Sequence, residues 1–157
     1  VHLLYGRGDA SINERILADA TPDHDVMAQV YRKLRSLQRN TPDDYFCVAD
    51  ADLAEAASDA FRAVSPTSAA CGLAVFRELG LIETRTVYEA GRPHLWVRVR
   101  EGASKVELTD SVRYREGIDE RTLFGGFCRW ALGTDEPALT VRLCHPIVPR
   151  NWPGQGH

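Results

Sequence analysis

The stretch that decides the fold runs from Ser65 to Arg100: SPTSAACGLAVFRELGLIETRTVYEAGRPHLWVRVR. Its first part has helical periodicity. Ser65 suits an N-cap, Pro66 suits the first helical position, and Gly80 ends the run. The apolar residues between them recur every three or four positions, at Ala69, Leu73, Phe76 and Leu79. The pattern predicts a helix from Ser65 to Leu79 with one buried face.

Beyond Gly80 the periodicity changes from helical to alternating. Two β-rich runs, Leu81 to Tyr88 and Pro93 to Arg100, are separated by Glu-Ala-Gly-Arg at 89–92. In the second run three aliphatic residues alternate with larger polar or aromatic ones: Leu95, Val97 and Val99 against Trp96, Arg98 and Arg100. Alternation on both sides of a glycine-containing turn predicts a β-hairpin.

Three helices are expected before this stretch. The first covers Ile12 to Ala20, where Ser11 and Glu14 have the spacing of a capping box. The second begins near Asp23 and Asp25 and ends near Arg35 and Arg39, charges that suit the two ends of a helix dipole. Its apolar stripe comprises Val26 or Met27, Val30, Tyr31, Leu34 and Leu37. The third, capped by Asp50 or Asp52, covers Leu53 to Phe61 after a turn at Asn40 to Asp44.

The two ends of the chain carry weaker patterns. Val1 to Tyr5 is typical of a short strand, and Leu139 to Leu143 of another. Lys105 to Leu108 follows a turn at Gly102 to Ser104 and is expected to be extended. Asp119 to Leu132 has the apolar content of a helix, and its central Gly125 and Gly126 predict either a bend or close packing of another backbone.

These elements together predict an α+β fold, in which a winged-helix-like domain is followed by a C-terminal helix and strand extension. The expected organisation is a strand and short helix leading in from a preceding domain at 1–20, the main domain at 21–116, the extension at 117–150 and an irregular tail at 151–157. Winged-helix domains bind nucleic acid or protein and rarely catalyse reactions.

Composition narrows the class of function only slightly. The chain has 157 residues, of which 44% are hydrophobic, enough for one well-cored domain. Its formal net charge of -3 argues against a uniformly basic nucleic-acid coat. Because no apolar run or leader directs it to a membrane, we expect a soluble, cytoplasmic protein. The start at Val1, without Met, predicts a piece of a larger polypeptide.

Residue types that bind metals or catalyse reactions do not cluster in the sequence. The four cysteines, Cys47, Cys71, Cys128 and Cys144, form no Cys-x-x-Cys pair. The histidines are scattered, and most of the aspartates lie near expected helix starts, where capping explains them. We therefore expect buried free thiols, no metal site and no catalytic residue.

The hairpin carries the best candidate surface for a partner. Nearly all positive charge is on arginine, since only Lys33 and Lys105 are lysines. Four arginines and one aromatic residue concentrate near the hairpin: Arg85, Arg92, Arg98, Arg100 and Trp96. In one interpretation, Trp96 offers a stacking surface beside phosphate-seeking guanidinium groups. In the other, Trp96 packs on the 119–132 helix and the arginines form a solvated rim.

Three segments, in this order, resemble the C-terminal domain of the bacterial single-stranded-DNA-specific exonuclease RecJ. They are Asp23 to Leu37 (DHDVMAQVYRKLRSL), Cys71 to Glu83 (CGLAVFRELGLIE) and Lys105 to Tyr114 (KVELTDSVRY). The family has an Asp-rich helix start leading to a Val-Tyr-x-x-Leu core, a Val-Phe-x-Glu-Leu helix running into a strand, and a Lys-x-x-Leu-x-x-Ser-x-x-Tyr segment. The resemblance covers roughly residues 1–116.

The resemblance implies a parent enzyme that degrades single-stranded DNA from its 5′ end in repair and recombination, using Mg or Mn bound by a DHH phosphoesterase core. The Asp-His-His motif is absent here. This chain is then an inert accessory domain that contacts the rest of its parent, binds single-stranded DNA weakly and docks the acidic tail of the single-strand DNA-binding protein. The expected docking residues are Arg85, Arg98 and Arg100 beside Trp96, with Arg113 and Arg115 as alternates.

Two other classes of function remain open. A self-standing winged-helix transcriptional regulator would have a basic recognition helix, whereas the 65–79 helix turns Thr67, Ser68, Cys71, Arg77 and Glu78 outward in the predicted pattern, a poor set for reading DNA. A small independent enzyme would require an assembled catalytic site.

Overall fold

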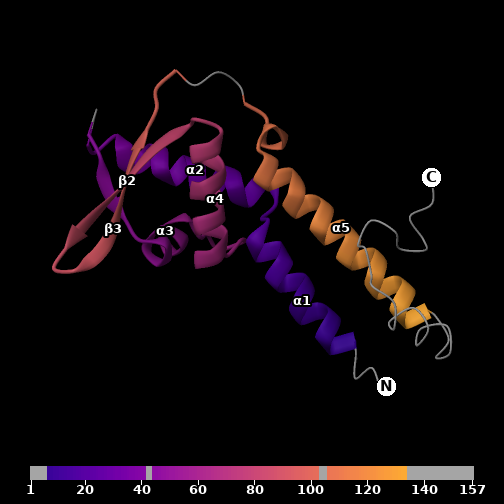
Figure 1. Ribbon diagram of the computed structural model, residues 1–157. Helices are drawn as coiled ribbons and strands as arrows, with labels where there is room; N and C mark the ends of the chain where they lie inside the picture. The colour runs from indigo at the N-terminus through magenta and orange to yellow at the C-terminus, as the bar shows by residue number, and fades with distance from the viewer. Residues whose placement is uncertain (1–6, 42–43, 103–105, 134–157) are drawn as a thin grey trace. The chain divides into compact units, whose positions relative to one another are not determined.

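The computed structural model describes residues 7–41, 44–102 and 106–133. The helices and strands in this part of the chain are α1 (Arg7–Ala20), α2 (His24–Gln38), β1 (Phe46–Val48), α3 (Asp50–Ala57), α4 (Pro66–Glu78), β2 (Ile82–Glu89), β3 (Arg92–Val99), the 3₁₀ helix η1 (Leu108–Asp110) and α5 (Val112–Gly133) (Figure 1). The fold is mixed helix and antiparallel sheet, as the α+β prediction requires.

Tertiary contacts divide the chain into two compact units. Residues 19–115 form the first, which contains α2, α3, α4 and the sheet. The described parts of the second are residues 7–18 and 116–133, which contribute most of α1 and α5. Among the described helices, none combines the length and apolarity needed to cross a bilayer.

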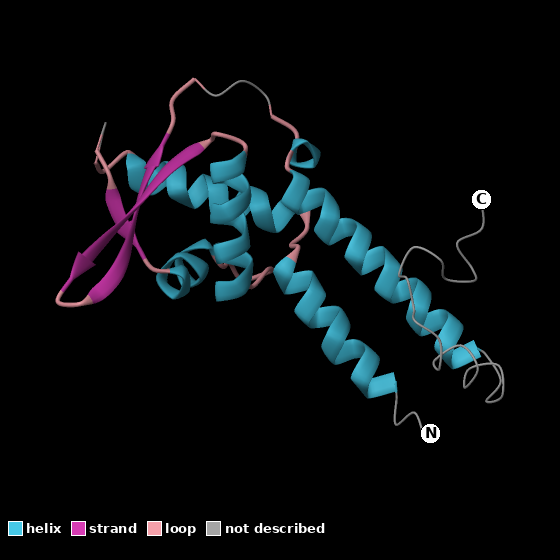
Figure 2. Cartoon of the chain, in the orientation of Figure 1, coloured by secondary structure: helices cyan, strands magenta, loops and turns pink. Residues whose placement is uncertain are grey.

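The sheet has three antiparallel strands in the order β1-β3-β2 (Figure 2). The predicted hairpin is present, and its turn is tighter than the sequence suggested, because Glu89 pairs with Arg92. Only Ala90 and Gly91 lie between the strands, with φ angles of 49° and 76°. Two consecutive residues with positive φ suit a two-residue hairpin turn, whose twist matches that of the strands.

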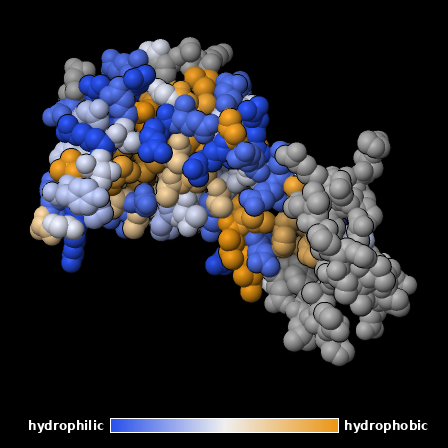
Figure 3. All heavy atoms as spheres, viewed as in Figure 1, coloured by the Kyte–Doolittle hydropathy of each residue, from blue (hydrophilic) through white to orange (hydrophobic). Residues whose placement is uncertain are grey.

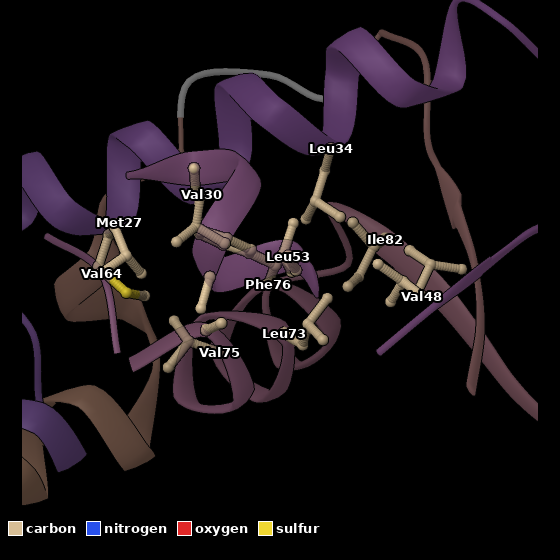
Figure 4. Packing of buried hydrophobic residues seen from close by; sticks show 14 of the residues in the cluster. Met27, Val30, Leu34, Val48, Leu53, Val64, Leu73, Val75, Phe76 and Ile82 are labelled. Atoms are coloured by element: carbon tan, nitrogen blue, oxygen red, sulfur yellow. The ribbon is translucent and has the colours of Figure 1, made fainter. Parts of the chain in front are cut away.

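Alternation along the strands gives the sheet an inner and an outer face. Val48, Ile82, Val97 and Val99 lie on the inner face and are buried. The hydrophobic core lies between this face and helices α2, α3 and α4. In Figure 4 core side chains from these helices and from the sheet point toward one another. Hydrophilic residues cover most of this unit on the face that Figure 3 presents.

The predicted stripe of α2 is confirmed, and Met27 rather than Val26 is its fully buried first member. Close packing of α2 on α4 requires a glycine in α4. A Cβ at Gly72 would lie 3.3 Å from Val30 Cγ1 and 3.7 Å from the Met27 sulfur. The glycine therefore lets the two helices approach at the centre of the core.

The expected signals of α4 are also confirmed. The Ser65 hydroxyl accepts a hydrogen bond from the Ser68 backbone N–H at 3.0 Å, and Gly80 follows the helix with φ 70°. One detail differs from the prediction, since Ser68 is buried instead of facing outward. Its hydroxyl donates to the Asp19 backbone carbonyl at 3.1 Å, which gives a buried polar group its partner.

Helix α3 begins and ends earlier than predicted, and the Asp50 or Asp52 cap is wrong, because Ala49 occupies that position. The helix stops at Ala57 since Asp59 organises a turn, accepting hydrogen bonds from the backbone N–H groups of Phe61 and Arg62. Phe61 is consequently not helical, and its side chain is 99% exposed.

Helices α1 and α5 both start before their predicted first residues. Ser11 lies inside α1, where its hydroxyl donates to the Gly8 carbonyl, so the capping-box prediction is wrong. Helix α5 starts seven residues before Asp119 because Glu78 binds its first turn: the carboxylate accepts from Ser111 Oγ and from the Val112 N–H, both at 2.7 Å. These bonds lower the pKa of Glu78, with the Ser111 bond as the largest cause.

Gly125 and Gly126 lie within α5, and no described backbone approaches them. A Cβ at Gly126 would meet nothing within 4 Å, and one at Gly125 would meet only the Arg129 side chain. Among the described residues, close packing therefore does not explain the pair. The predicted strands at 1–5 and 139–143 and the irregular tail at 151–157 fall outside the described residues, as do Pro42 and Asp43 in the 40–44 turn and Lys105 in the 105–108 segment.

Candidate partner-binding site

The outer face of the sheet carries a hydrogen-bonded cluster centred on Glu83. Its Oε2 atom accepts from the Tyr45 hydroxyl at 2.8 Å and from Arg98 at 2.6 Å. Its Oε1 atom accepts from Arg100 Nε at 2.9 Å. Three donors, one preceding β1 and two from β3 and its end, thus converge on one carboxylate, which is the geometry of a charge-assisted network.

This environment strongly favours the ionised carboxylate. The Tyr45 hydrogen bond, followed by those of Arg100 and Arg98, lowers the pKa of Glu83 from its ordinary 4.5 to about 2. The same bond raises the pKa of Tyr45, because the phenol loses a favourable contact when it ionises. At neutral pH the cluster therefore contains a carboxylate, a neutral phenol and two guanidinium groups.

Arg85 stacks on the aromatic residues of the same face. Its guanidinium carbon lies 4.2 Å from the Tyr45 ring centroid and 5.8 Å from that of Trp96. Arg98 also lies over Tyr45, at 5.2 Å. Trp96 is half-buried, and its indole nitrogen has no hydrogen-bond partner among the described residues. The predicted stacking surface is thus engaged by the protein's own cations.

Beside this cluster, a cleft of about 950 Å³ lies between the C-terminal half of α2 and the end of β3. Its lining combines cationic, polar and apolar side chains from α2 with residues of the sheet and the following turn: Tyr31, Arg35, Gln38, Arg39, Glu83, Arg98, Val99, Arg100, Glu101 and Gly102. Four of these residues are arginines and two are glutamates, so positive charge exceeds negative charge in the cleft.

Gln38 fixes the position of the α2 wall relative to the sheet. Its side-chain carbonyl accepts from the Val99 backbone N–H at 2.7 Å. Its amide donates to the backbone carbonyls of Thr41 and Asp44, at 2.6 and 3.0 Å. With these three bonds Gln38 joins the end of α2 both to β3 and to the chain leading to β1, which makes the cleft largely preformed.

Arg35 and Arg39 differ from the other arginines of the cleft. Arg35 is in the last turn of α2, and Arg39, four residues later, is its C-cap in helical conformation, so their side chains lie on the same side of the helix. Both are exposed, and neither has a carboxylate within 4.0 Å among the described residues. Arg98 and Arg100, by contrast, are bound to Glu83. The charge available to an external ligand is therefore on α2.

The residues selected from the sequence fall in three places. Arg85, Trp96, Arg98 and Arg100 share the region around Glu83. Arg92 is at the tip of the hairpin. The alternates Arg113 and Arg115 are exposed on the first turns of α5.

Sequence reasoning missed Tyr45, Glu83, Arg35 and Arg39 as members of the site. The hairpin register would have found one of these contacts, since Glu83 pairs directly with Arg98 once the turn is placed at 90–91. Opposite charges in such a cross-strand pair attract. Tyr45 gave no comparable signal, because it precedes a strand of only three residues.

Groups suited to metals or nucleophilic catalysis are sparse in the described part of the chain. It contains no cluster of three or more histidine, cysteine, aspartate or glutamate side chains that could hold a metal ion. Cys71 is half-buried and its burial raises the thiol pKa, which opposes formation of a thiolate. Cys128 is buried, but Cys47 is exposed on β1, contrary to the expectation of buried thiols.

Comparison of the chain with protein-family models, with curated proteins and with solved structures found no match.

Proposed function

We propose that this chain is an accessory docking domain of a RecJ-like single-stranded-DNA exonuclease, and that its cleft binds an acidic peptide ending in a hydrophobic residue, such as the tail of the single-strand DNA-binding protein. The observation that carries the docking role is the pair Arg35 and Arg39, which have no carboxylate partner among the described residues and line a cleft with Tyr31 and Val99. The link to the exonuclease rests on the three sequence segments given above.

The chemistry of the cleft matches that of such a ligand. Two guanidinium groups four residues apart can bind a terminal carboxylate with charge-assisted hydrogen bonds. Tyr31, which is half-buried, supplies apolar surface beside them, against which a hydrophobic last side chain can pack. A preformed wall adds to these two features by lowering the conformational cost of binding a short peptide.

The order of elements supports a winged-helix assignment for residues 19–115. A helix, a strand, two helices and a hairpin follow one another as α2, β1, α3, α4, β2 and β3, and the first strand pairs with the third. In this assignment α4 occupies the recognition-helix position and the β2–β3 hairpin is the wing.

The same assignment raises the second candidate, a self-standing DNA-binding regulator. Against it, Arg77 is the only basic residue of α4, and acidic Glu78 is its neighbour. A recognition helix normally offers several groups to phosphates and base edges. Tight, sequence-specific binding of duplex DNA that depends on Thr67 and Arg77 would favour the regulator over the docking domain.

The docking proposal is tested by titrating a fluorescent acidic peptide with a hydrophobic last residue against the chain. We expect saturable binding that is lost when the peptide's terminal carboxylate is amidated. The double variant Arg35→Gln, Arg39→Gln should weaken binding about tenfold or more, as expected for loss of charge-assisted contacts to one carboxylate.

The double variant Arg32→Gln, Lys33→Gln is the matched control, because it removes the same charge from the same helix at two positions that do not line the cleft. Equal losses in the two double variants would mean that net charge, not the cleft, holds the peptide. Absence of binding at low ionic strength would overturn the docking proposal.

A further inference from the structure

The four arginines of the cleft form two pairs, and only one pair binds a carboxylate among the described residues. Arg98 and Arg100 both bind the Glu83 carboxylate, at 2.6 and 2.9 Å. Arg35 and Arg39 have no comparable carboxylate among the described residues. The first pair thus holds an internal carboxylate in the way that the second pair could hold an external one.

Glu83 is well placed to keep its arginines. Its side chain is 27% exposed, and the Tyr45 hydroxyl provides a third donor that orients the carboxylate. Tyr45 is itself positioned beneath Arg85 and Arg98. An external anion that displaced Glu83 would have to break three hydrogen bonds and separate the carboxylate from two cations.

Because Glu83 binds Arg98 and Arg100, the cleft should treat a nucleic acid and a peptide carboxylate differently. A nucleic acid gains affinity from many phosphate contacts in a row, so it needs a continuous track of available cations. A peptide carboxylate needs only one pair of donors. With Glu83 in place, Arg35 and Arg39 are sufficient for the carboxylate, whereas the track that would continue through Arg98 and Arg100 is interrupted.

We propose that Glu83 is a specificity-determining residue that occupies Arg98 and Arg100 as an internal carboxylate ligand, so that the cleft discriminates against the phosphate backbone of single-stranded DNA. The inference deepens the docking function proposed above and rests on it for the identity of the favoured ligand. Its effect on nucleic-acid binding can be measured independently of any peptide.

The test compares Glu83→Gln with Glu89→Gln, which removes the same charge from the same strand at a position that does not line the cleft. The probe is a fluorescein-labelled short oligothymidylate, followed by anisotropy as salt is varied. Release of two arginines should raise the affinity of the Glu83 variant about tenfold at low salt, whereas the Glu89 variant should change by less than about twofold.

The salt slope provides a second measurement, made on the wild type and on the Glu83 variants. If only Arg35 and Arg39 of the cleft contact phosphates, log K should fall against log salt with a slope near −1.4, and Glu83→Gln should move it toward about −2.8. Adding Arg98→Gln and Arg100→Gln to Glu83→Gln should return both affinity and slope to wild-type values. Glu83→Met, which removes the charge without adding an amide, should reproduce the gain.

Several results would overturn the inference: equal gains in the Glu83 and Glu89 variants, a gain that persists in the triple variant, a wild-type slope already near about −2.8, or no binding by the Glu83 variants. The docking function fails separately. If Glu83→Gln gains DNA affinity but no peptide binds the chain, the role of Glu83 is supported and docking is refuted. If the peptide binds but Glu83→Gln leaves DNA affinity unchanged, docking is supported and the role of Glu83 is refuted.

Discussion

The two faces of the sheet use the same strands for opposite purposes. On the inner face, Val97 and Ile82 are buried against the helices and contact almost no water. On the outer face, the neighbours of these residues form a network of charges around Glu83. Burial of apolar surface stabilises a fold strongly, whereas exposed ion pairs stabilise it little. The comparison indicates that the inner face determines stability, and in our proposal the outer face determines which anions the molecule accepts.

The strongest test of this division compares two phenylalanines. Phe76 is 2% exposed and lies in the core beneath the sheet, whereas Phe61 is 99% exposed on the α3–α4 turn. Phe76→Ala should lower the free energy of unfolding by about 3–5 kcal/mol, because it removes a buried ring and leaves a cavity. Phe61→Ala should change it by less than about 0.5 kcal/mol. Denaturant unfolding of both variants measures the difference, and similar losses would contradict the assigned core.

A second test compares adjacent residues of β3 that face opposite ways. Val97→Ala should cost about 2 kcal/mol, since it removes two buried methyl groups from the inner face. Arg98→Ala should cost much less, because the side chain is partly exposed and its ion pair is screened by water. A larger loss at Arg98 than at Val97 in thermal or chemical unfolding would show that the outer network is a principal source of stability.

The third test concerns the turn that assigns residues to the two faces. Gly91 has a φ angle of 76°, and an alanine there should cost about 1 kcal/mol through backbone strain. Gly126 is the control: a Cβ would also meet nothing described within 4 Å, but the residue is helical, so Gly126→Ala should be stabilising. Thermal unfolding distinguishes the two signs, and stabilisation by Gly91→Ala would contradict the assigned turn.

The central part of the fold could be predicted because its signals are local. Ser65 caps α4 by binding a residue three positions away, and the alternation of apolar with polar or aromatic residues predicts the hairpin strands. The missed features depend on distant partners. Glu78 begins α5 from 34 residues away, and strand β1 is too short to show a period. Arg98 and Arg100 had no evident partner in the sequence, because Glu83 pairs with Arg98 only once the turn is placed at Ala90 and Gly91, and because Tyr45, 38 residues from Glu83, has no local signal.

The smallest expected effect is an acid-dependent loss of stability from Glu83. Its folded-state pKa is about 2, below the ordinary 4.5, so ionisation favours the folded protein. The contribution is fully present above about pH 4.5 and is lost as the pH falls toward about 2, because protonation then removes the partner of Arg98 and Arg100. Asp25, Asp59 and Glu78 also have lowered pKa values and act in the same acidic range, so the wild type alone cannot isolate Glu83.

The difference between wild type and Glu83→Gln in unfolding midpoint should therefore be largest at neutral pH and shrink on acidification. The same difference for Glu89→Gln is the control for loss of charge alone. If the difference in unfolding midpoint between wild type and Glu83→Gln stays constant down to about pH 2, this carboxylate is not held by its arginines in solution. The outer face would then lack the charge network that distinguishes it from the inner face.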